Sequence, residues 1–203
     1  MIDNFKLLRP AFQFKSDDDF YFLQIIKRKK EHPDMPKSVK VVHVFYITSL
    51  NKLDELEKEI KDLCTYHNAR AYINLNKRSF KALAFQMLKQ VTDCIISGEY
   101  QYVRKSFNTV CGRFHAEDKT DKKWIVDIDT KDECFMKHVK TVVTSCDPQG
   151  TKIHYEIPTK NGWHLITRPF NILQFQERFM IQDTENTTLV DIHKNNPTVL
   201  FTL

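Results

Sequence analysis

The run 124–130 places two aspartates among large apolar residues that favour a β-strand. Side chains two positions apart on a strand point to the same face, so Asp127 and Asp129 would project together. Val126 and Ile128 would pack on the opposite face. Two neighbouring carboxylates repel each other, and each raises the pKa of the other, unless a cation neutralises them. The run therefore predicts a divalent-cation site on a sheet, with a solvated strand face as the alternative.

A third acid lies in a similar setting near the C-terminus. Asp191 follows Leu189 and Val190 in another apolar, strand-like run. Carboxylate oxygens suit Mg²⁺ or Mn²⁺, which leave coordination positions open for substrate phosphates. Three carboxylates could hold two such ions about 4 Å apart, as nucleotidyl transfer requires. The alternative for Asp191 is an ordinary turn or edge residue.

A turn between two expected strands carries the candidate phosphate-binding residues. Gly162 would permit close approach of another backbone or of a phosphate. His164 begins the following strand, and with Lys160 it could donate hydrogen bonds to a phosphate. Arg168 would share the face of His164 if the extended conformation continues. Each of these side chains could instead be an ordinary packed or exposed residue.

Two further basic segments are candidates for phosphate contacts. Lys77 and Arg78 precede an expected helix, whose N-terminus attracts anions. The run 27–30 contains four consecutive basic residues. Such a run is usually a solvated helix end, and the more specific alternative is a contact with a nucleic-acid backbone.

The elements expected along the chain alternate before they become hairpins. Ser16 and the three aspartates after it are typical of a helix start. We expect helices over 16–30, 52–66, 79–97, 131–146 and 170–179, a short helix within 99–123, and strands over 39–48, 69–76, 123–129, 152–157, 163–167, 188–192 and 198–202. This order predicts an α+β protein in which helices flank a mixed β-sheet.

Composition bounds the class of protein without selecting a function. The 203 residues are 41% hydrophobic, which is enough for one folded domain, and 4 glycines give little support for a flexible linker. The net charge of +5 permits a polyanionic partner. Five cysteines without a CxxC pair are typical of reduced thiols. With neither a signal peptide nor a run of transmembrane length, we expect a cytoplasmic protein and no membrane partner.

Together, the motifs resemble those of a known family. The sequence has an acidic pair on a strand, then Gly162-Trp163-His164, then Val190-Asp191. This order is similar to that of the three motifs of the archaeo-eukaryotic primases, including the primase-polymerases of phages and mobile elements. The segment 71–76 also resembles a strand common near the start of primase-polymerases. The resemblance spans roughly residues 40 to 203.

The resemblance implies a fold and an activity. Residues 1–203 would form one catalytic domain, with an N-terminal α/β part over 1–120 and an RRM-like palm over 121–203. Its reaction would be template-directed nucleotidyl transfer that makes or extends primers on single-stranded DNA. The resemblance implies that Asp127, Asp129 and Asp191 hold two Mg²⁺ or Mn²⁺ ions. His164 would bind the triphosphate, with Lys160, Arg168 and Arg78 as further candidates.

The implied partners are a single-stranded DNA template, nucleoside triphosphates and a replicative helicase or another replication protein. A phage-encoded protein would act in the host cytoplasm. Two alternatives stay open. One is a metal-dependent nuclease that uses the same carboxylates, and the other is a non-catalytic RRM-like module that stacks single-stranded bases on aromatic side chains.

Overall fold

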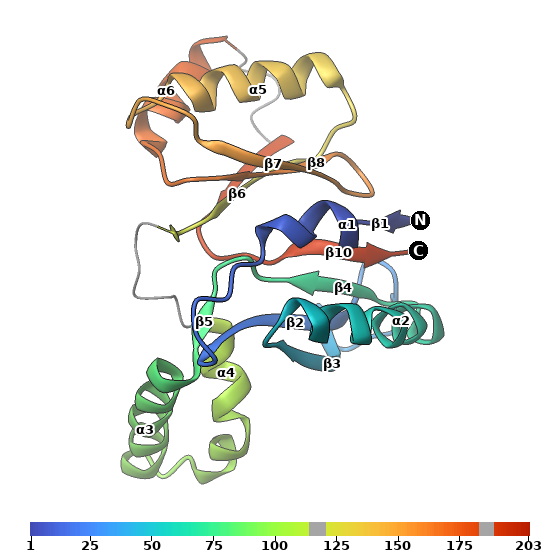
Figure 1. Cartoon of the computed structure of the whole chain (residues 1–203), viewed down its shortest axis with the longest axis vertical. Helices are drawn as coiled ribbons and strands as arrows, with labels where there is room; N and C mark the ends of the chain where they lie inside the picture. Colours follow the sequence, from blue (N-terminus) through green and yellow to red (C-terminus); the bar gives the residue numbers. More distant parts are fainter. Residues whose placement is uncertain (114–120, 183–188) are drawn as a thin grey trace.

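A computed structural model describes residues 1–113, 121–182 and 189–203, and it contains two β-sheets (Figure 1). The first sheet has the order β1-β10-β4-β2-β3, with β5 on β2, and the second has the order β7-β8-β6-β9. The strands are β1 (Ile2–Asp3), β2 (Asp19–Arg28), β3 (Val39–Ile47), β4 (Arg70–Ile73), β5 (Arg78–Ser79), β6 (Trp124–Ile128), β7 (Ile153–Pro158), β8 (Trp163–Thr167), β9 (Val190–His193) and β10 (Thr198–Thr202). Every strand pairing in the described ranges is antiparallel, so the α+β class is confirmed and the expected mixed sheet is wrong.

Six α-helices and two short 3₁₀ helices surround the sheets in the described ranges. They are α1 (Phe5–Leu8), η1 (Arg9–Ala11), α2 (Leu50–His67), α3 (Phe80–Ile96), η2 (Tyr100–Lys105), α4 (Ser106–Arg113), α5 (Glu133–Ser145) and α6 (Ile172–Gln182). In Figure 1, α5 and α6 cover the outer face of the second sheet, and α3 and α4 lie at the opposite end of the molecule. No helix in the described ranges is long and apolar enough to cross a membrane.

The central strand of the second sheet has the two different faces that its sequence predicts. Val126 and Ile128 are fully buried in a cluster with residues of α5 and α6. Ile125 points the other way and joins the large core that the first sheet builds with α2. Asp127 shares the face of Ile125, because the two positions are two residues apart on one strand. The polar face of β6 therefore looks toward the first sheet.

The expectation of a helix over 16–30 is wrong, because residues 19–28 form the longest strand of the first sheet. Leu23 and Ile25 pack into the core beneath α2, while Phe20 and Phe22 pack on the opposite face with residues of α3 and α4. A strand buried on both faces is apolar throughout, and its periodicity alone does not distinguish it from a helix.

The aspartates ahead of this strand stabilise a helix other than their own. The Asp18 carboxylate accepts a hydrogen bond from the backbone N–H of Lys81 at 2.8 Å, and it also accepts one from the Ser79 hydroxyl. Both partners belong to the N-terminal turn of α3, where Ser79 is the N-cap residue. Asp19 accepts hydrogen bonds from the Lys77 ammonium and the Lys15 N–H, both at 2.6 Å. The acids thus lie at a helix N-terminus, as their charge favours, but the helix is α3.

The last strand returns to the first sheet. Although it lies within the part 121–203 that was expected to form the palm, β10 pairs with β1 and β4. The Asn4 side chain adds a second connection, since its amide donates to the carbonyls of Pro158 on β7 and Val199 on β10 at 3.1 and 3.0 Å. Ile157 and Ile166 of the second sheet are buried in the same cluster as the first-sheet core. The two sheets therefore share one hydrophobic core.

We predict that Asp18→Ala destabilises the protein by about 1 kcal/mol, because the N-terminal turn of α3 loses an acceptor for its backbone N–H groups. Asp17→Ala is the matched control, since Asp17 is an exposed neighbour of the same type. Urea unfolding of both variants measures the difference. Equal stability of the two variants would contradict the capping role of Asp18.

Candidate functional site

Asp127 lies at the centre of the second sheet, and the register places two expected site residues beside it. On one side it pairs directly with His164 of β8, and on the other it pairs directly with Asp191 of β9. Directly opposed residues in an antiparallel pair share a face, with their Cβ atoms about 4.5–5.5 Å apart. His164 Nε2 lies 3.3 Å from Asp127 Oδ1. Strand pairing thus gathers three residues that are far apart in the sequence.

His164 is held in place through its second ring nitrogen. Its Nδ1 lies 2.9 Å from the hydroxyl oxygen of Thr198, the first residue of β10. Thr198 is fully buried, so this contact is shielded from water. The imidazole is therefore oriented from both ends, by Asp127 on the second sheet and by Thr198 on the first.

His193 is a member of the site that the sequence reasoning missed. Its Nε2 lies 4.0 Å from Asp127 Oδ2 and 3.6 Å from Asp191 Oδ2. The imidazole thus lies within 4.0 Å of both carboxylates. The signal was present in the sequence, because His193 follows Asp191 by two residues on one strand and shares its face.

The surroundings of Asp127 favour its ionised form. Burial by itself would raise the pKa of this carboxyl group. The hydrogen bond and charge of His164, together with the charges of His193 and Arg28, outweigh the burial and hold the pKa of Asp127 below its ordinary value. Asp127 is therefore maintained as a carboxylate although its side chain is only 28% exposed.

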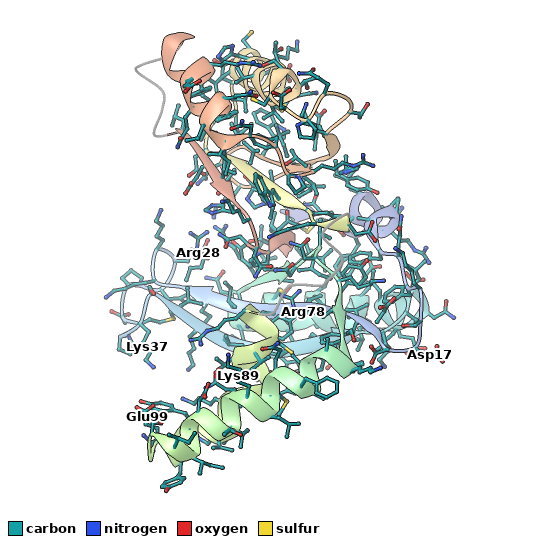
Figure 2. The ribbon with its side chains drawn as sticks, turned by 90° about the vertical axis from the view of Figure 1, so that its left-hand side faces the viewer. Asp17, Arg28, Lys37, Arg78, Lys89 and Glu99 are labelled. Carbon is teal, nitrogen blue, oxygen red and sulfur yellow. The ribbon has the colours of Figure 1, made fainter. Side chains whose placement is uncertain are left out.

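A polar pocket lies between the two sheets. Figure 2 shows Arg28 on the side of the first sheet that faces the second. The second sheet and its turn contribute Asp127, Asp129, Thr159, Lys160, Asn161 and His164, and the first sheet with the loop after β2 contributes Arg28, Lys30, Glu31, Arg70, Tyr72 and Val199. Asp127 and Asp129, which were expected to project together, both line this pocket. Asp127 and Asp129 thus face Arg28 and Arg70 across it, and Lys160 lies on the side of the aspartates.

The basic side of the pocket is organised around one tyrosine. Arg28 and Arg70 each direct a guanidinium nitrogen at the Tyr72 hydroxyl, at 3.3 and 3.5 Å. Arg70 also forms a close ion pair with Glu31. These arginines come from the end of β2 and the start of β4, which are neighbours in the sheet. Because guanidinium groups match phosphate oxygens in geometry, this side can bind a phosphate beside the carboxylates.

Two expected phosphate ligands lie elsewhere. Arg78 is buried, with 1% exposure, and donates to the main-chain oxygens of Cys111 and Asn76 at 2.6 and 2.5 Å. Burial lowers the pKa of Arg78 to about 10. Its position inside the first-sheet half, visible in Figure 2, does not fit a phosphate contact. Arg168 is exposed beyond the end of β8 and, four residues from His164, lies about 13 Å along the strand.

In the described part of the chain, no three His, Cys, Asp or Glu side chains are arranged to hold a metal ion. The Asp127 oxygens face two imidazoles instead. The donor chemistry nevertheless fits Mg²⁺ or Mn²⁺, because Asp127, Asp129 and Asp191 offer only oxygen atoms from neighbouring positions. The Asp191 side chain is 75% exposed, so packing does not fix its carboxylate.

Comparison with known proteins gives no match among family models, curated protein sequences or solved structures. The interpretation of the site therefore depends on its own geometry.

Gly162 makes the close approach that its position in the sequence predicts. A Cβ atom added there would lie 1.9 Å from the carbonyl oxygen of Ile128 and 2.6 Å from that of Thr130. These atoms flank Asp129 at the end of β6, so only glycine lets the turn before β8 pack against the acidic segment.

We predict that Gly162→Ala costs about 1–3 kcal/mol, because backbone must move to admit the methyl group. Gly112→Ala is the matched control, since Gly112 lies in α4 with nothing within 4 Å of the added atom. Helix propensity should make that control neutral or stabilising by up to about 1 kcal/mol. Thermal and urea unfolding measure both variants, and equal effects would contradict the close approach.

Proposed function

We propose that this chain is a primase-type nucleotidyltransferase that joins nucleotides on a single-stranded DNA template. The observation that carries the proposal is the direct opposition of Asp127 to His164 and Asp191 on three adjacent strands. This arrangement supports the resemblance on grounds independent of motif order, because the register, rather than the sequence spacing, gathers the three residues.

The acidic side of the pocket would hold the divalent cations. Asp127 and Asp129 line the pocket, and Asp191 lies opposite Asp127 on β9. In this proposal the three carboxylates would be the ligands of two Mg²⁺ or Mn²⁺ ions. Bound cations would neutralise phosphate charge and lower the pKa of the attacking hydroxyl group. If the Asp127 carboxylate held a cation, the Nε2 atom of His164, which now lies 3.3 Å from Asp127 Oδ1, would be free for another partner. The Thr198 hydroxyl keeps the ring oriented, so that Nε2 can bind a triphosphate oxygen.

Basic groups from both sheets would bind the triphosphate. Lys160 lines the pocket beside His164, and Arg28 faces them from the first sheet. The charge of Arg28 already acts on Asp127, since it contributes to the lowered pKa of that carboxyl group. Phosphoryl-type transfer relies mainly on positioning and on charge stabilisation, which these fixed groups can supply.

A larger groove adjoins the pocket and offers a path for the template. It has a volume of about 1290 Å³ and runs along the β2–β3 hairpin to α4. Lysines line it at four positions, namely Lys27, Lys37, Lys40 and Lys105. Glu31 borders both the groove and the pocket, so the two hollows lie next to each other. A basic groove leading to the acidic site is the arrangement that a single-stranded polyanion requires.

The two alternatives predict different behaviour. A nuclease would use the same carboxylates but would cleave DNA without added nucleotides. An RRM-like binding module would need aromatic side chains on an open sheet face. In the described ranges, the strongly exposed Tyr and Phe side chains lie on helices α2, α3 and η2, at positions 66, 85, 100 and 102. This distribution favours the catalytic proposal over base stacking on a sheet.

We predict that Asp127→Asn abolishes Mn²⁺-dependent nucleotide incorporation on a primed single-stranded template, with a loss of about a hundredfold or more. His164→Ala and Arg28→Ala should each lose about 10- to 100-fold, because each removes a charge-assisted contact to the triphosphate. Primer extension on a denaturing gel measures these rates.

Arg104→Ala is the control for this series, since Arg104 is exposed in η2 and does not line the pocket. Full incorporation by Asp127→Asn would refute the proposal. Cleavage of the template in the absence of nucleotides, lost in Asp127→Asn, would establish the nuclease instead.

We also predict that Lys37→Ala/Lys40→Ala weakens the binding of single-stranded DNA and reduces its salt dependence. Each lost phosphate contact should lower the slope of log affinity against log salt by about 0.7. Lys6→Ala/Lys58→Ala removes the same charge from exposed positions outside the groove. Fluorescence anisotropy with a labelled oligonucleotide compares the two. Equal losses would show that binding follows net charge and not the groove.

A further inference from the structure

Helix α3 has an apolar face that no other described element covers. Of its 17 residues, only Leu83 and Cys94 are buried. The opposite side carries Phe85, Leu88 and Ile95, which are 64%, 66% and 53% exposed. Figure 1 places this helix at the end of the molecule opposite α5 and α6. Exposed apolar rows of this kind mark interaction surfaces in proteins that do not cross membranes.

The exposed residues follow the spacing of a coiled-coil seam. Steps of four and three residues alternate along one line of the helix, as in the a and d positions of a heptad repeat. The positions of this line within α3 are all exposed, namely Lys81, Phe85, Leu88, Thr92 and Ile95, and the exposed Glu99 continues the spacing three residues past the end of the helix. We call this row the α3 seam. Its spacing suits packing against a second helix.

The α3 seam is symmetric about position 90. Lys81 and Glu99 lie nine residues to either side of this position, and Phe85 and Ile95 lie five residues to either side. In an antiparallel pair of identical helices centred there, the ammonium of one copy faces the carboxylate of the other at both ends. Between these ends, Phe85 of each copy faces Ile95 of the other, and Leu88 faces Thr92. A two-fold interface requires this self-complementarity.

The acidic end of the α3 seam is attached to the helix although Glu99 follows its last turn. The Glu99 N–H donates to the Cys94 carbonyl at 2.9 Å, after Gly98 adopts a φ of +72°. Figure 2 shows Glu99 at the outer tip of this half of the molecule, just past the end of the helix that carries Lys89. The tip is therefore open to a second molecule.

We propose that two copies of this chain form a homodimer by antiparallel pairing of their α3 seams. The charge pattern selects a second copy as the occupant, because the positive and the negative end of one seam match the opposite ends of its own copy. A single helix pair is smaller than a standard protein interface, so we expect a dissociation constant of about 1–100 µM. The proposal is independent of the proposed catalytic function.

Sedimentation velocity over a wide concentration range tests this pairing. The apparent mass should rise from 24.1 kDa toward twice that value. Leu88→Glu should keep the fold by circular dichroism and raise the dissociation constant at least about tenfold, because it buries a charge in the seam. Leu173→Glu is the matched control, since this leucine of α6 is 70% exposed and lies outside the α3 seam.

Reversal of the end charges tests the antiparallel direction. Lys81→Glu or Glu99→Lys alone should weaken the dimer about 2- to 10-fold, since like charges then meet at both ends. The double variant Lys81→Glu/Glu99→Lys restores opposite charges across the interface and should return to native affinity. Parallel pairing would juxtapose like charges in the native protein and in the double variant alike, and each single reversal would leave the repulsion in place.

Three results would overturn the proposal. The protein could stay monomeric at all concentrations, the dimer could survive Leu88→Glu with unchanged affinity, or the double charge reversal could fail to restore what the single reversals lose. Nucleotide incorporation by Leu88→Glu at low concentration reports separately on the catalytic proposal.

Discussion

The opposition of Asp127 to a histidine on one side and an acid on the other organises this molecule. It requires β6 to lie between β8 and β9, so that residues from three chain segments meet on one face. The reverse face of β6 must then be wholly apolar, and α5 and α6 bury it. A carboxylate in this half-buried position is stable only because imidazole and guanidinium groups surround it. The order β8-β6-β9 thus gives Asp127 the neighbours that its charge needs.

The first sheet completes the site and does more than support it. Its last strand, β10, provides Thr198, which orients His164, and the ends of β2 and β4 provide Arg28 and Arg70. The chain crosses from β9 directly into β10, so the two sheets are joined within a few residues of the site. Asn4 and the shared apolar core tie the same two layers together. A pocket between the layers thereby has Asp127 and Asp129 on one side and Arg28 and Arg70 on the other.

Sequence patterns predicted the second sheet well and the first sheet less well. The strand carrying Asp127 and the hairpin around Gly162 were expected nearly at their observed bounds, because alternation and turn residues act locally. Residues 16–30 were wrongly expected to form a helix. The acids near Asp18 cap the N-terminus of α3 instead, and a strand buried on both faces, as β2 is, lacks the alternation that identifies a strand. The start of the expected strand 188–192 lies outside the described residues, and its remainder agrees with β9.

By itself, the sequence determined which side chains share a strand face, because a period of two residues is a local property of extended backbone. It therefore determined that Asp127 and Asp129 project together, and that His193 accompanies Asp191. Only the tertiary structure decided which strands are neighbours, and so which residues face one another across the sheet. It brought Arg28 and Tyr72 to the pocket, buried Arg78 and left Arg168 at the far end of β8. Strand order and register depend on packing between distant segments, and no local pattern encodes them.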